Sequence, residues 1–462
     1  MEKFYLDDYL KLKIREEDRK GLDFQKLCRR VNSEFLREWE DGRENLDSAL
    51  RIQKKAIIGY ENEVAYFKSR IRQQIKKYAA EHSSYPAWYD SLEDGIYHEN
   101  WGLAGISEWF SEKHRESSSA KIIGDRIYFL EEGRMCLKPQ TISKDRREQM
   151  IRAFLLLTPE ERLDKDFHEV YMLDGTRVTI FGGGMTKREQ DVIIFRRYIV
   201  PSYSFEEQAS RGTIPGDAIP FLKAMVKLGY NVAFTGAVRT AKTTFLSTWQ
   251  SYEDRSLEGV MVETDPEIPI HELMPEAPIL QLIADNEKLK HISKNLLRSD
   301  ADYFILAEAR DGIALDTAVK IASKGSRRMK ITFHTRDPLD FSYDVAFEIV
   351  KSLGGDLDST ARKVAASFDY IFHFIQLKNK DQKRLKSIYE LGLDKNSREI
   401  TMREICRYNH ATDDWTWEHH ISEDKWLIGE EEDAEMLKQF ESEMKKLARR
   451  VGERRQNANG VS

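Results

Sequence analysis

The chain has 462 residues, of which 33% are charged and 40% hydrophobic, and its net charge is −6. This length allows two or three domains with sizeable cores, and the negative balance gives no support for a protein built mainly to bind nucleic acid. The three cysteines are far apart and include no CxxC pair, which fits a reducing compartment and excludes a disulfide framework or a cysteine zinc site.

The charged first residues, MEKFYLDDYLKLKIREEDRK, predict no signal peptide. No apolar run approaches the roughly 18 residues that would be needed to span a bilayer. We therefore expect a cytoplasmic protein. Peripheral docking at the inner face of the cell membrane stays open.

Residues 1–112 are predicted to form a helical N-terminal segment. The run 46–82 has helix-spaced apolar residues and is interrupted only by Gly59. Its alternating charges are typical of a solvated face, and a partner-binding helix is the alternative. The tryptophans that follow, at 88, 101 and 109, are interpreted as core anchors in preference to a base-stacking platform.

Residues 113–201 are predicted to form an α+β N-domain. Glu131, Glu132 and Gly133 mark the turn of a hairpin, and Ser143 is the expected N-cap of an amphipathic helix. Asp174-Gly175 is a second turn signal between strands. The polar, turn-rich stretch 202–216 is expected to be a linker.

Residues 217–422 alternate helix and strand in the α/β manner, and 423–462 are predicted to be a charged helix and tail. The segments FDYIFHFIQLK and KRLKSIYELG predict a closing antiparallel pair. Further strands are expected at 259–265, 302–310 and 330–335.

The stretch NVAFTGAVRTAKTTF has the order strand, loop, Lys-Thr, helix, which is that of a phosphate-binding loop, GxxxxGKS/T. In such a loop the backbone N–H groups and the helix N-terminus point at phosphate oxygens. Lys242 would reach the β- and γ-phosphates, and the Thr243 hydroxyl would hold Mg²⁺. The predicted nucleotide-contacting residues are Gly236, Ala237, Val238, Arg239, Thr240, Ala241, Lys242, Thr243 and Thr244.

The loop departs from this pattern where its second glycine is expected, because Ala241 stands there. Glycine is used at such positions because the backbone approaches phosphate closely and can require a positive φ. The alternative is an ordinary strand-turn-helix that carries an exposed lysine.

Three later strands end in groups that suit phosphate chemistry. Glu308 and Arg310 follow one strand, Glu263 and Glu267 follow another, and His334 ends a third. Hydrolysis of a nucleoside triphosphate needs a carboxylate and cations around the terminal phosphate. Because ligands bind at the carboxyl ends of parallel strands, this convergence favours a nucleotide site.

The segments GAVRTAKTT, VETDPEIPI, RSDADYFILAEARDG and ITFHT occur in an order that resembles the secretion and pilus-assembly ATPases of the type II and type IV secretion superfamily. The branch that serves tight-adherence pili and conjugation-type channels is the most similar. The resemblance covers about residues 100–410. In it, DGTRVTI and VIIFRRY correspond to N-domain strands whose arginines contact the nucleotide, which implies Arg177, Arg196 and in third place Arg197.

This resemblance implies an α/β fold, with a RecA-like P-loop NTPase domain after an α+β N-domain and an N-terminal helical segment. ATP and Mg²⁺ are the implied cofactors. The implied catalytic residues are Lys242, Glu308, Arg310 and His334, with Glu308 polarising the attacking water and His334 contacting the γ-phosphate. Glu263 and Glu267 would be acids near Mg²⁺. Ala241, Thr264 and Ala307 depart from the family pattern and put efficient catalysis in doubt.

The predicted function is a cytoplasmic ATPase that powers protein secretion or pilus assembly by nucleotide-driven domain motion in a hexameric ring. A polytopic membrane platform protein is the expected partner. The first alternative is a pseudo-ATPase, a structural ring subunit with weak or no hydrolysis. The second is a nucleic-acid-dependent NTPase, which the net charge of −6 disfavours, so nucleic acid is not an expected partner.

Overall fold

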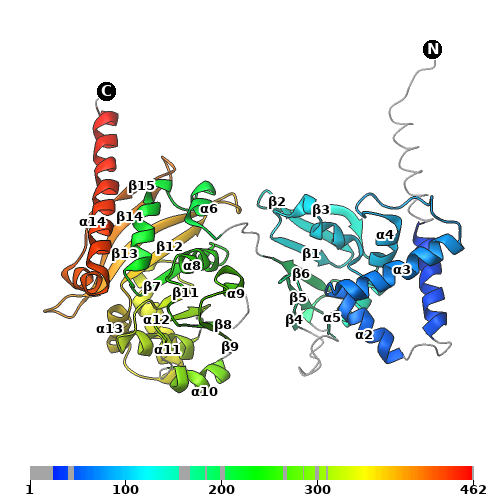
Figure 1. The fold of residues 1–462 in the computed structure, drawn as a ribbon, viewed down its shortest axis with the longest axis horizontal. Helices are drawn as coiled ribbons and strands as arrows, with labels where there is room; N and C mark the ends of the chain where they lie inside the picture. The colour runs from blue at the N-terminus through cyan, green and yellow to red at the C-terminus, as the bar shows by residue number, and fades with distance from the viewer. Residues whose placement is uncertain are drawn as a thin grey trace, which may run out of the picture. The chain divides into compact units, whose positions relative to one another are not determined.

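The computed structural model describes residues 24–39, 46–155, 167–182, 185–197, 203–263, 268–284, 286–296, 301–308 and 311–459. The chain divides into two compact units, 1–199 and 200–462. In Figure 1 the first unit runs from blue to teal and the second from green to red.

The first unit begins with helices. One covers 24–39, and it is followed by α2 (Leu46–Ile57), α3 (Glu61–Lys77) and α4 (Leu92–Asn100). The predicted helical run 46–82 is therefore two helices. The break lies at Gly59, whose φ of 103° is incompatible with a continuous right-handed helix.

Stacked aromatic rings hold these helices together. The Trp101 ring lies 4.5 Å from Phe35 and 4.9 Å from Phe67, measured between ring centroids. Trp101 and Trp109 are both buried, so their interpretation as core anchors is confirmed. Trp88 packs at the edge of the same cluster.

Six strands of the first unit form one antiparallel sheet in the order β3-β2-β1-β6-β5-β4, within the residues the structure describes. After the short 3₁₀ turns η1 (Ala104–Phe110) and η2 (Glu112–His114), the elements are β1 (Ser119–Ile123), β2 (Arg126–Glu131), β3 (Arg134–Thr141), α5 (Lys144–Leu155), β4 (Phe167–Tyr171), β5 (Arg177–Phe181) and β6 (Val192–Arg196).

Local signals of the sequence are confirmed in this unit. Glu132 and Gly133 have φ of 47° and 74°, as a two-residue hairpin turn requires. The Ser143 hydroxyl accepts a hydrogen bond from the Arg146 amide and caps α5. The Asp174 carboxylate accepts a backbone N–H and closes the turn between β4 and β5.

The second unit is built on a mixed sheet, whose described strands run in the order β15-β14-β13-β12-β7-β11-β10-β8-β9. The six from β12 to β9 are parallel to one another, and β13, β14 and β15 are antiparallel. The strands are β7 (Val232–Gly236), β8 (Gly259–Glu263), β9 (Ile279–Ile283), β10 (Tyr303–Ala307), β11 (Lys330–Phe333), β12 (Tyr370–Gln376), β13 (Lys383–Leu393), β14 (Ile400–Asn409) and β15 (Asp414–Trp417).

The predicted fold class is confirmed: an α/β unit with a mixed, largely parallel sheet follows N-terminal helices and an antiparallel sheet. The antiparallel pair β12–β13 is also confirmed. The sequence did not predict β9, β14 or β15.

Helices cover both faces of the second sheet. They are α6 (Phe205–Ser210), η4 (Gly216–Ala218), α7 (Ile219–Lys227), α8 (Lys242–Ser251), α9 (Ile270–Leu273), α10 (Asn286–Leu296), α11 (Gly312–Ser323), η5 (Pro338–Asp340), α12 (Phe341–Leu353), α13 (Leu357–Ser367) and α14 (Glu423–Asn459). Phe234 of β7 faces α7 and α8, while its neighbour Ala233 faces α11, α12 and α13, which lie together in Figure 1.

The long helix α14 belongs to the core of the second unit. The Phe440 ring stacks on Phe221 of α7 with 4.9 Å between centroids, and Leu437 and Met444 are also buried. Asp433 has non-helical φ and ψ and separates two helical stretches. No helix among the described residues is long and apolar enough to cross a membrane.

A buried charge network lies at the start of β11. The Glu253 carboxylate is 2.6 Å from the Lys330 ammonium, and both side chains are only 1% exposed. Glu253 also pairs with Arg328, which reaches Glu432 of α14 at 2.5 Å. The network joins the end of α8, the sheet and α14.

Because the Lys330 ammonium is buried, removing its carboxylate leaves an uncompensated charge. We expect Glu253→Ala to lower the free energy of unfolding by about 3–5 kcal/mol, measured by urea denaturation. Lys351→Ala, which removes an exposed lysine, is the control and should change it by less than about 0.5 kcal/mol. A loss for Glu253→Ala as small as that of the control would contradict the prediction.

Candidate functional site

The predicted phosphate-binding loop connects β7 to α8 at the carboxyl end of the parallel strands. β7 lies between β11 and β12 and ends at Gly236. Gly236 has φ of 140°, and a Cβ atom there would lie 2.3 Å from the Phe374 carbonyl oxygen. The loop then closes on itself, because the Thr240 hydroxyl donates to the Ala237 carbonyl at 2.9 Å.

The loop takes glycine-like conformations at residues that are not glycine. Ala241, the N-cap of α8, has φ of 69° and ψ of 23°, and Arg239 has φ of 66°. The left-handed conformation costs about 1–2 kcal/mol per residue for side chains with a Cβ. The substitution of alanine for the expected glycine therefore leaves the conformation of the loop in place and adds strain.

Lys242 and His334 meet although 92 positions separate them. The buried Lys242 ammonium donates to the Ala237 carbonyl at 2.8 Å and lies 3.2 Å from His334 Nδ1. His334 follows β11, and the last residue of that strand pairs with Thr235 of β7. Nδ1 can accept a hydrogen bond from an ammonium only when the imidazole is neutral.

Glu308 follows β10, on the far side of β11 from β7. Its amide donates to the Thr332 hydroxyl of β11 at 2.7 Å, and its φ of 56° is again left-handed. The structure thus places Lys242, His334 and Glu308 at the same end of neighbouring strands. Arg310 lies outside the described residues.

Of the two proposed metal-binding acids, Glu263 and Glu267, only Glu263 lies among the described residues. The Glu263 side chain is buried, and its Oε1 accepts a hydrogen bond from the Ile268 amide at 3.1 Å, so it caps the loop after β8. Glu267 and Thr264 lie outside the described residues. Thr243 occupies the first turn of α8, next to Lys242.

No cluster of three or more His, Cys, Asp or Glu that could hold a metal occurs in the described part of the chain. Mg²⁺ is usually held by one or two protein oxygens together with waters and substrate phosphates. The Thr243 hydroxyl, in the first turn of α8, is an oxygen of the kind that this pattern needs. The described residues contain no set of acids and histidines that would enclose the ion by themselves.

Sequence reasoning missed His373, which lies in β12 beside the loop. Its side chain is buried, and its Nδ1 lies 3.0 Å from the Thr235 hydroxyl of β7. Burial lowers the pKa of His373 to about 4, and the positive charges of Lys386 and Lys242 contribute to this shift. A single imidazole inside the apolar strand YIFHFIQ was the available signal.

Arg177 and Arg196 lie in the first unit, directly opposite each other on β5 and β6. Arg197 instead has a structural role, because its guanidinium lies 4.1 Å from the Trp109 ring and donates to the Ser117 carbonyl. Nucleotide contact by Arg177 and Arg196 stays a prediction.

No protein-family model matches the chain, and no curated protein matches it. Among solved structures it is similar to the VirB11 ATPase of the Brucella suis type IV secretion system, in complex with sulphate, at 13% identity and a TM-score of 0.34, covering 62% of this chain and 92% of that one. It is similar to the Legionella pneumophila ATPase DotB at 14% identity and a TM-score of 0.44, covering 74% and 87%. It is similar to the pilus retraction motor PilT with bound ADP at 13% identity and a TM-score of 0.43, covering 69% of this chain and 84% of that one.

The strain in the loop predicts opposite effects of two reciprocal substitutions. Ala241→Gly relieves a left-handed alanine, so we expect the free energy of unfolding to stay equal or rise by up to about 1 kcal/mol. Gly236→Ala places a methyl group against the Phe374 carbonyl, so we expect a loss of more than about 2 kcal/mol. Urea denaturation of both variants tests this, and a loss for Ala241→Gly would contradict it.

The low pKa of His373 predicts that the free energy of unfolding depends on pH. Its pKa is about 4 in the folded protein, against roughly 6.5 when unfolded, so the unfolded state binds the proton first. The free energy of unfolding that neutral His373 contributes is fully present above pH 6.5 and is lost as the pH falls towards 4. We expect about 2 kcal/mol of this loss by pH 5. His373→Asn should lack this component, and equal pH dependence of both proteins in urea denaturation would rule the prediction out.

Proposed function

We propose that this chain is a cytoplasmic motor ATPase of a protein-secretion or pilus-assembly system. The observation that carries the proposal is the contact of Lys242 with His334 beside a loop of phosphate-binding form, with Glu308 at the same end of the neighbouring strand. These residues come from three motifs that are distant in sequence. An ordinary strand-turn-helix gives no reason for them to converge.

Each residue has a task that follows from its position. The Lys242 ammonium would leave the Ala237 carbonyl and bind the β- and γ-phosphates, while the amides at the start of α8 bind phosphate oxygens. Bound Mg²⁺, held by the Thr243 hydroxyl, would neutralise phosphate charge. Glu308 would orient and polarise the attacking water. His334 would lose its contact with Lys242 and contact the γ-phosphate instead.

The wider role rests on the order of the sequence motifs. By that resemblance the protein would form a hexameric ring and pass nucleotide-driven domain motion to a polytopic membrane platform protein. Arg177 and Arg196, which form a cationic pair on neighbouring strands, would contribute to nucleotide binding.

One observation favours a second candidate, a ring subunit that does not hydrolyse ATP. The Lys242 ammonium already has the Ala237 carbonyl and His334 as partners, and Ala241 adds strain to the loop. Nucleotide would have to compete with these internal contacts. The two candidates differ in whether steady-state hydrolysis occurs.

Two substitutions separate these candidates. Lys242→Ala removes the phosphate-binding ammonium, so we expect binding of Mg-ATP to be lost in titration calorimetry. Glu308→Gln keeps the shape of the side chain and removes its charge, so we expect binding to persist while kcat falls by about 10²-fold or more.

Glu258→Gln, which changes an exposed acid before β8, is the matched control and should keep wild-type activity. Wild-type protein that binds ATP without hydrolysing it, unchanged by Glu308→Gln, would establish the non-hydrolysing subunit. Wild-type hydrolysis that survives Lys242→Ala would show that the activity does not belong to this site.

A further inference from the structure

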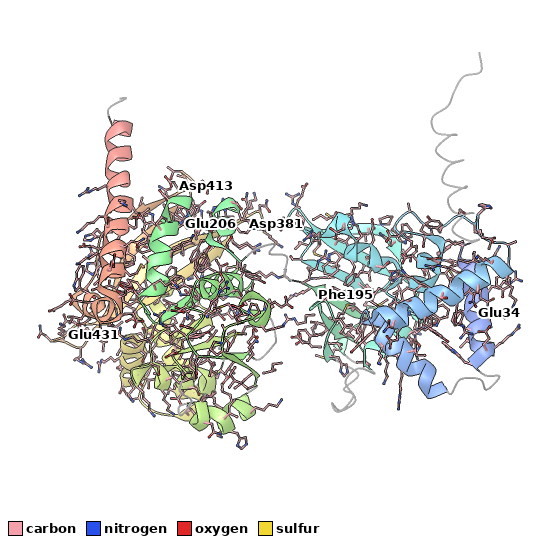
Figure 2. The ribbon with its side chains drawn as sticks, viewed as in Figure 1. Glu34, Phe195, Glu206, Asp381, Asp413 and Glu431 are labelled. Carbon is pink, nitrogen blue, oxygen red and sulfur yellow. The ribbon has the colours of Figure 1, made fainter. Side chains whose placement is uncertain are left out.

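The β12–β13 hairpin is strongly basic although the chain as a whole is acidic. Between 378 and 386 the sequence KNKDQKRLK contains five cations and one acid, Asp381, which Figure 2 labels in the second unit. Arg384 is already used, because its guanidinium pairs with Asp413 at 3.1 Å. The Lys383 ammonium donates a hydrogen bond to the Lys380 carbonyl at 2.5 Å, so its present partner is neutral, and Lys386 is exposed.

Strand register places this hairpin beside the phosphate-binding loop. Phe374 of β12 pairs with Gly236, the last residue of β7. β12 continues to Gln376, which pairs with Lys383, the first residue of β13. The hairpin therefore extends past the end of β7, where the loop that contains Arg239 begins.

A β-bulge in the same hairpin contains a second lysine. His373 pairs with Ser387 and Phe374 pairs with Leu385, which leaves Lys386 as the extra residue between them. Bulges redirect side chains and are frequent next to functional sites. The Lys386 charge acts on His373, which itself contacts Thr235 in the strand before the loop.

Arg239 and Lys383 are near enough for their charges to interact, and Asp381 is the acid that acts on Lys383. Within the described residues, Lys383, Lys386 and Arg239 take part in no ion pair with an acidic side chain. Burial lowers the pKa of the Lys383 ammonium, the charge of Asp381 opposes this, and the charges of Arg211 and Arg239 lower it further. Such a cluster is relieved by a bound anion.

The order of the sheet indicates which part of a nucleotide the cluster would face. Glu308 and His334 follow β10 and β11, on one side of β7, and the hairpin lies on the other side. In the proposed function the terminal phosphate lies near Glu308 and His334. The hairpin is then next to the phosphates that ADP and ATP share.

We propose that Lys383 and Lys386 of the hairpin, with Arg239 of the loop, form a second anion subsite that binds the α- and β-phosphates of nucleoside di- and triphosphates. This inference rests on the proposed function and adds residues that bind and orient the ligand without taking part in hydrolysis. Glu308 and His334, on one side of β7, would then respond to the terminal phosphate. The hairpin, on the other side, would hold the α- and β-phosphates.

The test measures binding of fluorescent ADP and ATP, with Mg²⁺, to Lys383→Ala and Lys386→Ala in the full chain. We expect the Kd of both nucleotides to rise about tenfold in each variant, as the loss of one charge-assisted hydrogen bond implies, while kcat at saturation changes less than twofold. Lys395→Ala is the control, since this lysine follows the far end of β13 and pairs with Glu423. It should bind like the wild type.

Thermal unfolding of each variant, together with Lys383→Gln, separates loss of binding from loss of fold. Unchanged Kd values in the folded variants would overturn the subsite and leave the proposed function standing. Weakened binding of ATP alone would overturn the assignment to the shared phosphates. Wild-type protein that binds neither nucleotide would overturn both the subsite and the proposed function.

Discussion

The candidate site depends on one close approach, that of Gly236 to the backbone of Phe374. The end of β7 is held there between β11 and β12, with no room for a Cβ atom. The strand order determines what flanks the loop on each side. It places His334 and Glu308 to one side and His373 and the basic hairpin to the other. A change in this register would separate groups that are distant in sequence, because each is positioned only by its strand.

Three of the ten non-glycine residues with left-handed φ in the described chain lie at the candidate site. Arg239, Ala241 and Glu308 all have left-handed φ values, although none of them is glycine. At about 1–2 kcal/mol each, these conformations persist only because surrounding contacts hold them, such as the hydrogen bond from the Glu308 amide to Thr332. Strained backbone of this kind is concentrated at functional sites. Ala241 therefore has the left-handed conformation that the expected glycine would have, so the loop keeps its shape without that glycine.

Short-range features of the fold were predictable from sequence. The hairpin turn at Glu132, the cap at Ser143 and the α/β order of the second unit depend on neighbouring residues, and all were predicted. Features set by distant contacts were not. β9, β14 and β15 are recognisable only once β8 and β13 are present to pair with them. The charged helix α14 was predicted, but the packing of its apolar residues on α7 was not. In the site, the motif residues could be named, but the contact of Lys242 with His334 and the position of His373 depend on strand order.

Charge shows the same difference between global and local properties. The net charge of −6 argued against anionic macromolecules as partners, yet a sum over 462 residues says little about the field at one loop. At physiological ionic strength charges act over about 8 Å, so a phosphate beside Gly236 would experience mainly the charges of the loop itself, such as Lys242 and Arg239, and few of the acids elsewhere. A basic site on an acidic protein also favours small anions over long polyanions, because the surrounding surface repels the rest of a polymer. The charge distribution therefore fits a nucleotide better than a nucleic acid.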